Sequence, residues 1–215
     1  MKILVSGFEP FGGNAVNPTE QLVRDIREET FAETEIRTVL LPVHYDECAE
    51  RLLEAVRDYQ PDAVICCGLA AGRTAVTPER IAVNVKDVAP EAAYADNKGE
   101  RPQDLPINPA GPDGLFSRLP IREAVNRLKA EGIPAAVSES AGTFICNNTM
   151  YAVLDYIREQ KLPTLAGFVH FPASTEMALQ KPGLPSLPQE IMLRALRVIV
   201  HATIDAAKQQ RQPAV

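Results

Sequence analysis

The sequence lacks the features that would direct it to a membrane, out of the cell or onto nucleic acid. No stretch approaches the roughly 18 consecutive apolar residues of a membrane span. The apolar run in residues 1–10 is too short for a signal-peptide core and has no small-residue cleavage site. The formal net charge is −6, and the sequence has no cluster of basic residues of the kind that binds nucleic acid. We therefore expect a cytoplasmic protein with no membrane and no nucleic-acid partner.

Cysteine is scarce, and its spacing is unlike that of a metal site. The four cysteines are Cys48, Cys66, Cys67 and Cys146, and they form neither a CxxC pair nor a Cys/His pattern of zinc type. Reduced thiols in the cytosol fit this distribution better than a disulfide framework does. Structural zinc is excluded on the same grounds, and we expect no metal site.

Two common catalytic motifs are also missing. The glycine-rich segment FEPFGGNAVNP (8–18) matches neither GxxxxGK[ST] nor GxGxxG, so it is not a phosphate loop. A GxSxG motif is absent too, which argues against a serine hydrolase. Phe8 and Phe11 flank this loop and suit the aromatic walls of a small, flat ligand site. Core packing is the alternative for either ring.

Apolar, β-branched runs alternate with helical patterns along the whole chain. Strands are expected at 2–6, 35–43, 62–67, 80–85, 134–139 and 164–170, and helices from 17–19 onward and at 45–59, 121–131, 147–160 and 188–207. Residues 87–120 hold much of the proline and read as a long irregular excursion. We predict one catalytic domain over 1–215, an α/β/α sandwich around a twisted, largely parallel (mixed) sheet. Ligands of such sheets bind beyond the carboxyl ends of the strands.

The three histidines differ in their surroundings. His44 opens a helical segment directly after a strand, where it can simply cap the helix. His201 lies within the last helix and is interpreted as a packed or solvent-facing residue. His170 ends the apolar run TLAGFV, which places an imidazole at a strand terminus. A catalytic role and a hydrogen-bonded core role are equally compatible with that position.

Two further residues have the chemistry to work with a histidine. Cys146 follows a Gly-Thr turn signal and comes immediately before a predicted helix, where the helix dipole would lower the pKa of its thiol and free N–H groups could stabilise an oxyanion. Glu79 follows the turn after the strand at 62–67 and could orient a histidine. Taken alone, a small buried cysteine and a surface glutamate are the simpler interpretations.

Several segments together resemble the pyroglutamyl peptidase I family of cysteine peptidases. The likeness covers nearly the whole chain. It rests on these segments, which occur in the family's order: GFEPFGGNAVNP, GLAAGRTAVTPERIAVN, ADNKGERPQDLPI, GPDGLFSRLPI, SAGTFICNNTMY and GFVHFP. The resemblance implies a Cys-His-Glu triad of Cys146, His170 and Glu79, no cofactor, and a homotetramer.

The resemblance also implies a set of substrate-binding positions. These are Phe8, Phe11, Asn17, Leu69 and Phe144. Many family members have glutamine where this chain has Leu69, and the stretch VAPEAAYAD (88–96) is longer than is usual in the family. Asp96 matches a family aspartate whose role we take to be secondary. The implied reaction is hydrolysis of the bond after an N-terminal pyroglutamyl residue of a peptide, through a thioester. The alternatives are a small-molecule binding protein and another hydrolase or nucleoside-processing enzyme on the same scaffold.

Overall fold

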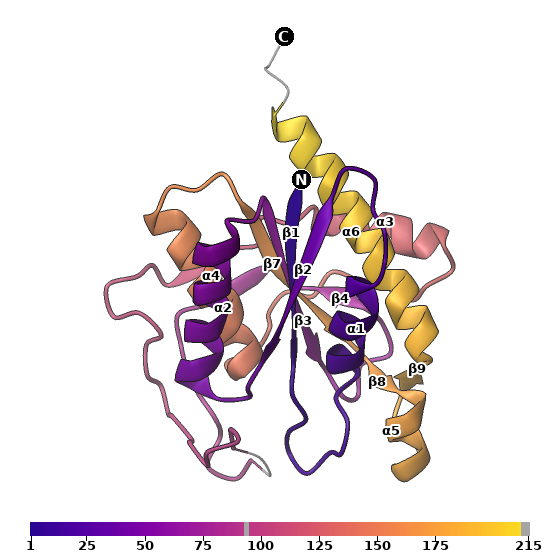
Figure 1. Cartoon of the computed structure of the whole chain (residues 1–215). Helices are drawn as coiled ribbons and strands as arrows, with labels where there is room; N and C mark the ends of the chain where they lie inside the picture. Colours follow the sequence, from indigo (N-terminus) through magenta and orange to yellow (C-terminus); the bar gives the residue numbers. More distant parts are fainter. Residues whose placement is uncertain (93–94, 212–215) are drawn as a thin grey trace.

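The computed structural model describes residues 1–92 and 95–211, and in them a twisted sheet lies between two layers of helices (Figure 1). The strand order is β2-β1-β3-β7-β4. The strands are β1 (Lys2–Phe8), β2 (Glu35–Leu41), β3 (Ala63–Leu69), β7 (Leu165–Phe171) and the short β4 (Thr77–Pro78). The first four are parallel and β4 is antiparallel to β7. The prediction of a single α/β domain with a mixed, mostly parallel sheet is confirmed.

Helices cover both faces of the sheet. One face carries α2 (Tyr45–Tyr59) and α4 (Ile145–Glu159), and the other carries α1 (Pro18–Arg27), α3 (Ile121–Ala130) and α6 (Gln189–Arg211) (Figure 1). The short helix α5 (Thr175–Gln180) follows β8 (Ala173–Ser174), which pairs with β9 (Ser186–Leu187). A second small ladder joins β5 (Ile81–Val83) to β6 (Gly114–Phe116). Among the helices described, none combines the length and apolar character needed to span a bilayer.

Side-chain alternation along the strands divides the core in two. Ile3 and Val5 of β1 pack on the α1/α3/α6 side, whereas Leu4 packs on the α2/α4 side. In β7, Phe168 lies in the α2/α4 cluster and Val169 in the opposite one. Because successive side chains of a strand point to opposite faces, His170 faces α2 and α4.

Local sequence signals set most of the boundaries. The predicted helix 45–59 has the observed bounds of α2, and the predicted helix start at 17–19 is the start of α1, capped by Asn17. Two of the predicted strands differ most from the structure. Residues 134–139 form only isolated bridges, Val76 with Ala135 and Glu79 with Ser138, and the strand predicted over 80–85 is the shorter β5, outside the central sheet.

Candidate active site

A cysteine and a histidine lie against the same glycine at the carboxyl edge of the sheet. Gly68 of β3 pairs with His170 of β7 in the parallel register. A Cβ atom built on Gly68 would lie 3.0 Å from the Sγ atom of Cys146. Cys146 is the second residue of α4, which begins at Ile145, two residues earlier than the sequence predicts. The thiol is therefore inside the first turn of the helix, above the strand that neighbours His170.

Glu79 reaches the same histidine from the edge strand. Thr77 of β4 pairs with His170, and the Glu79 N–H donates to the Phe168 carbonyl at 2.9 Å. This register makes Glu79 a diagonal cross-strand neighbour of His170, on the same face of the sheet. Its Oε1 atom lies 2.7 Å from His170 Nδ1, and its side chain is fully buried. Because this contact uses Nδ1 of the ring, Nε2 is the nitrogen that can accept or donate a proton.

The charges of the three groups are set by burial and by one another. Burial alone would raise the pKa of Glu79, but its hydrogen bond to His170, together with Ser138 and Arg73, lowers that pKa below its usual range. Burial lowers the pKa of His170, although Glu79 opposes this. Burial also raises the pKa of the Cys146 thiol well above its ordinary value. The resting pair is therefore a neutral thiol and a neutral imidazole beside an ionised carboxylate.

The direction of the Cys146 shift is opposite to the sequence expectation of a lowered pKa. The first turn of α4 has no side-chain cap and no acidic residue, so its dipole does favour an anion there. Partial burial of the thiol outweighs that effect, because a thiolate packed against the sheet loses part of its hydration. The thiol consequently needs a base to remove its proton during attack.

The start of α4 is fixed to the rest of the molecule by asparagine side chains. Asn147 Oδ1 accepts from the Val83 N–H at 2.9 Å, and its Nδ2 donates to the carbonyls of Val83 and Val85 at 2.8 and 3.0 Å. Asn148 Nδ2 donates to the Tyr45 carbonyl at 2.6 Å. These contacts hold the helix start between β5 and α2, so the position of Cys146 is determined from both sides.

Two of the aromatic residues predicted to bind substrate lie together near Cys146. Phe144 is the N-cap residue of α4, and its ring centroid is 6.3 Å from that of Phe11. Both residues are half-buried. Phe8 differs, because it is 3% exposed and packs on Phe168 with 6.3 Å between ring centroids. For Phe8 the structure therefore favours the core-packing alternative.

The remaining predicted substrate residues are already engaged within the protein. Asn17 Oδ1 accepts from the Thr19 N–H at 3.1 Å, and its Nδ2 donates to the Glu9 carbonyl at 3.0 Å, so it shapes the loop before α1. Leu69 ends β3 in a small apolar cluster with Met177, against which Phe11 packs. It offers no hydrogen-bonding group to a ligand.

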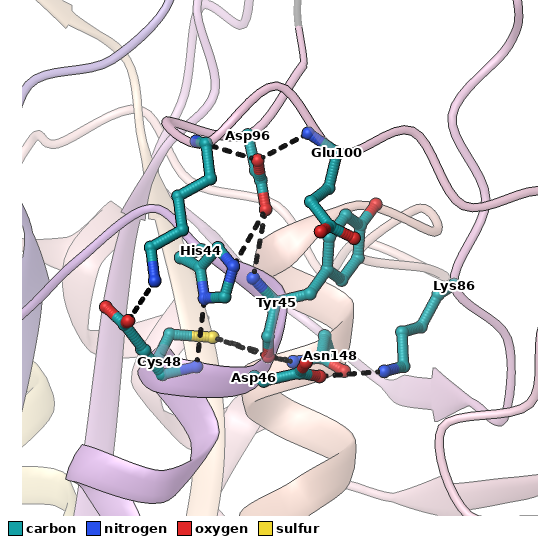
Figure 2. A network of polar contacts seen from close by, with 10 residues as sticks. His44, Tyr45, Asp46, Cys48, Lys86, Asp96, Glu100 and Asn148 are labelled. Carbon is teal, nitrogen blue, oxygen red and sulfur yellow. Dashed lines mark hydrogen bonds and ion pairs between the residues drawn. The ribbon is translucent and has the colours of Figure 1, made fainter.

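Asp96 is the centre of a polar network at the start of α2 (Figure 2). Its Oδ1 atom accepts the N–H groups of Lys98 and Glu100 at 2.9 and 2.8 Å. Its Oδ2 atom lies 3.4 Å from the Tyr45 nitrogen and 3.7 Å from His44 Nε2. A fully buried carboxylate with this many donors organises its loop. Lys98 and Glu100 are neighbours of Asp96 along the chain, whereas His44 and Tyr45 come from a distant segment that the motif around Asp96 does not indicate.

The same network connects that loop to the aromatic residues above Cys146. His44 caps α2, as the sequence predicts, because its Nδ1 accepts from the Glu47 N–H at 3.2 Å. The Tyr45 ring meets Phe144 edge-on, with 5.6 Å between centroids. Asp96 is therefore connected through one residue, Tyr45, to Phe144, the N-cap residue of the helix that carries Cys146.

Cys48, Cys66 and Cys67 are buried, whereas Cys146 is partly exposed. Burial raises the pKa of Cys48 to about 11 and that of Cys66 to about 12. His201 is exposed on α6, with its ring 5.2 Å from that of Phe31. Within residues 1–92 and 95–211, no three His, Cys, Asp or Glu residues form a group that could hold a metal ion. A cavity of about 690 Å³ between α1 and the segments 174–176 and 188–190 includes neither Cys146 nor His170 in its lining.

Comparison with known proteins gives one consistent family. Residues 1–207 match the family model described as pyroglutamyl peptidase. The pyrrolidone-carboxylate peptidase of Halalkalibacterium halodurans is 44% identical over 92% of this chain and 96% of its own length. Two solved structures are each 37% identical over 96% of this chain. A mutant pyrrolidone carboxyl peptidase from Pyrococcus furiosus has a TM-score of 0.91 and is covered over 99% of its length. Pyroglutamyl peptidase I from Bacillus amyloliquefaciens has a TM-score of 0.88 and is covered over 97%.

Proposed function

Because the chain belongs to the pyroglutamyl peptidase family, we propose that it hydrolyses the bond after an N-terminal pyroglutamyl residue, with Cys146 as nucleophile and His170 as base. The observation that carries the assignment is the convergence of three elements on one point. Cys146 from α4 lies over Gly68, His170 from β7 is the strand partner of Gly68, and Glu79 binds Nδ1 of the imidazole. This is the geometry of a nucleophile, a base and a residue that orients the base.

The first half of the reaction forms a thioester. As Sγ of Cys146 attacks the pyroglutamyl carbonyl, His170 takes the thiol proton, and ionised Glu79 stabilises the resulting imidazolium. The N–H groups at the uncapped start of α4 are positioned to stabilise the tetrahedral oxyanion. The intermediate then collapses, the C–N bond breaks, and His170 delivers its proton to the leaving amine.

The second half returns the enzyme to its starting state. Water enters where the amine has left, and neutral His170 removes one of its protons during attack on the thioester carbonyl. Collapse breaks the C–S bond, frees pyroglutamate and returns a proton to Cys146. The cycle needs no redox partner and no cofactor, which agrees with the resemblance.

The ring of the substrate is proposed to bind beside Phe11 and Phe144. A planar lactam suits the space near two half-buried aromatic rings, and backbone groups would satisfy its polar edge. Pyroglutamate has no free α-amino group, so recognition needs no carboxylate to bind an ammonium. Because Leu69 contributes only apolar surface, the hydrogen bonds to the lactam in this chain would come from other groups.

Release of a chromophore from a pyroglutamyl amide tests the activity. The wild-type chain should hydrolyse it, and Cys146→Ala should lose at least about 10³-fold in kcat/KM. Cys48→Ala, which also removes a thiol facing α4, is the matched control and should keep its turnover. Binding of pyroglutamate without hydrolysis of any pyroglutamyl amide would favour the small-molecule binding alternative.

Thiol alkylation provides a second test. Iodoacetamide should modify Cys146 first, because Cys48, Cys66 and Cys67 are fully buried whereas Cys146 is not. Modification should abolish hydrolysis, and pyroglutamate should protect against it. The cytoplasmic location expected from the sequence stays a prediction, which cell fractionation tests. The homotetramer that the resemblance implies stays one too, and light scattering of the purified chain tests it.

A further inference from the structure

An arginine outside the predicted triad binds the same oxygen atom as the histidine. Arg73 lies in the turn between β3 and β4, where its N–H donates to the Ala70 carbonyl at 3.1 Å. Its Nη1 atom donates to Glu79 Oε1 at 2.7 Å, and His170 Nδ1 lies 2.7 Å from that same Oε1. Two donors from different elements thus meet on one carboxylate oxygen.

The carboxylate has few other means of staying charged. The Glu79 side chain is fully buried, and its second oxygen, Oε2, has no hydrogen-bond partner in the part of the chain that the structure describes. The nearby Ser138 hydroxyl, which donates to the Ser140 carbonyl, adds a neutral dipole. Arg73 is permanently charged, and about a third of its side chain is exposed, so it can remain solvated while it pairs with Glu79.

Charge balance among these groups leads to the inference. A buried carboxylate is unstable without a cation, so Glu79 would either take up a proton or draw one onto His170. The first outcome removes the charge that stabilises the imidazolium. The second removes the base that must accept the proton of Cys146. Arg73 supplies the cation without using the proton-accepting capacity of His170.

We propose that Arg73 is a positioning residue that keeps Glu79 ionised while His170 stays neutral, and so sets the pH range in which His170 acts as a base. The inference rests on the proposed function, because it concerns the same base. The charged groups that act on the imidazole are Glu79 after β4 and Arg73 from the preceding turn. The Phe168 ring lies 4.9 Å from the imidazole, and the Cys146 thiol from α4 lies over Gly68, the strand partner of His170.

The sign of the effect follows from the charges. Arg73 disfavours a second positive charge on His170, and burial lowers the pKa of His170 in the same direction. Without Arg73, the negative charge of Glu79 would act on the imidazole uncompensated, so the imidazolium would persist to higher pH. The acid limb of the pH profile of kcat/KM should therefore move upward when Arg73 loses its charge.

The test is an NMR titration of the His170 ring in the full-length chain carrying Cys146→Ala, so that it does not depend on turnover. Adding Arg73→Met or Arg73→Gln should raise the titration midpoint of His170 by about half a pH unit or more. Arg73→Lys keeps the charge and should return the midpoint close to that of the parent. Arg127→Met is the matched control, because Arg127 is similarly exposed and pairs with Glu123 and Asp205, away from the triad.

A parallel measurement with active chains uses the pH profile of kcat/KM. The acid limb should move upward in Arg73→Met and stay in place in Arg127→Met. An unchanged His170 midpoint in both neutral variants would overturn the proposal. Failure of both neutral variants to fold would overturn it too, since Arg73 would then serve the fold and not the protonation state. If Cys146→Ala kept its peptidase activity, the proposed function would fail, but the titration would still report on Arg73.

Discussion

Cys146 lies directly over Gly68, with its sulfur atom 3.0 Å from the position that a Cβ atom would take on the glycine. The same Cβ would come within 2.6 Å of the Phe168 ring. No L-residue other than glycine fits here without moving the nucleophile or the ring beneath it. The absence of a side chain at Gly68, the strand partner of His170, therefore leaves the space that the sulfur atom of Cys146 occupies.

Gly68→Ala should consequently impair catalysis as well as folding. A displaced sulfur should lower kcat about 10²-fold, and overpacking should lower the free energy of unfolding by about 1–3 kcal/mol. Gly167→Ala is the matched control on the opposite face of the sheet, where the new Cβ would meet the Ser117 hydroxyl at 2.3 Å. That variant should lose stability but keep kcat per folded molecule, and a wild-type kcat in Gly68→Ala would refute the packing argument.

The free energy of unfolding should fall as the pH drops below about 6.5. The pKa of His170 is lowered in the folded state, so protons bind the unfolded chain more readily, and stability is fully present only above the unfolded pKa. The slope attributable to one such group is at most about 1.4 kcal/mol per pH unit. The depressed pKa of Glu79 adds a second loss, which sets in at more acidic pH.

Urea unfolding at a series of pH values measures this dependence. His170→Gln should flatten the slope just below pH 6.5, whereas His201→Gln, on the exposed face of α6, should leave it as in the wild type. A slope that is identical in His170→Gln and wild type would show that His170 is not the group responsible.

Asp96→Asn should loosen the loop at 95–100 and the start of α2 together. The amide oxygen can still accept from Lys98 and Glu100, but the amide NH2 then takes the place of Oδ2 and faces the Tyr45 N–H, so two donors oppose each other at a cost of about 1–3 kcal/mol. Hydrogen exchange measured by mass spectrometry should accelerate in both segments. Asp104→Asn, an exposed position in the same excursion, is the control. Loosening confined to the loop would show that the connection to α2 carries no stability.

The site should discriminate strongly between pyroglutamyl and prolyl amides. The two rings are nearly the same size, but proline lacks the ring carbonyl and carries a charged amine. A site whose buried groups hydrogen-bond the lactam should therefore reject proline by about 10⁴-fold in kcat/KM. Competitive steady-state assays of the two amides measure the ratio. Discrimination below about 10-fold would mean that the pocket reads only ring shape.

Local sequence patterns predicted the elements but not all of their contacts. The periodicity of residues 45–59 and the Asn-Pro-Thr signal at 17–19 depend on neighbours along the chain, and both predictions are confirmed. The pairing of Glu79 with His170 depends instead on the two-residue strand β4, which no periodicity can reveal. Segment 134–139 has the composition of a strand but makes only isolated bridges.

The candidate site residues also differ in whether local sequence indicates them. Signals at element boundaries make Cys146 and His170 candidates in the sequence, and the resemblance to the family selects them. Arg73 and Gly68 cannot, since their importance arises from a shared oxygen atom and from a missing side chain in a folded register. The raised pKa of Cys146 was missed for a related reason, because helix position is visible in sequence but burial by distant segments is not.

The central claim is that Cys146 becomes acylated during hydrolysis of the pyroglutamyl bond. Acid quenching of the wild-type chain during turnover of a pyroglutamyl ester, followed by peptide mass spectrometry, tests it most directly. The peptide that carries Cys146 should gain the mass of one pyroglutamyl group, and no such gain should occur in Cys146→Ala. Acylation of another residue, or hydrolysis by Cys146→Ala at the wild-type rate, would contradict it.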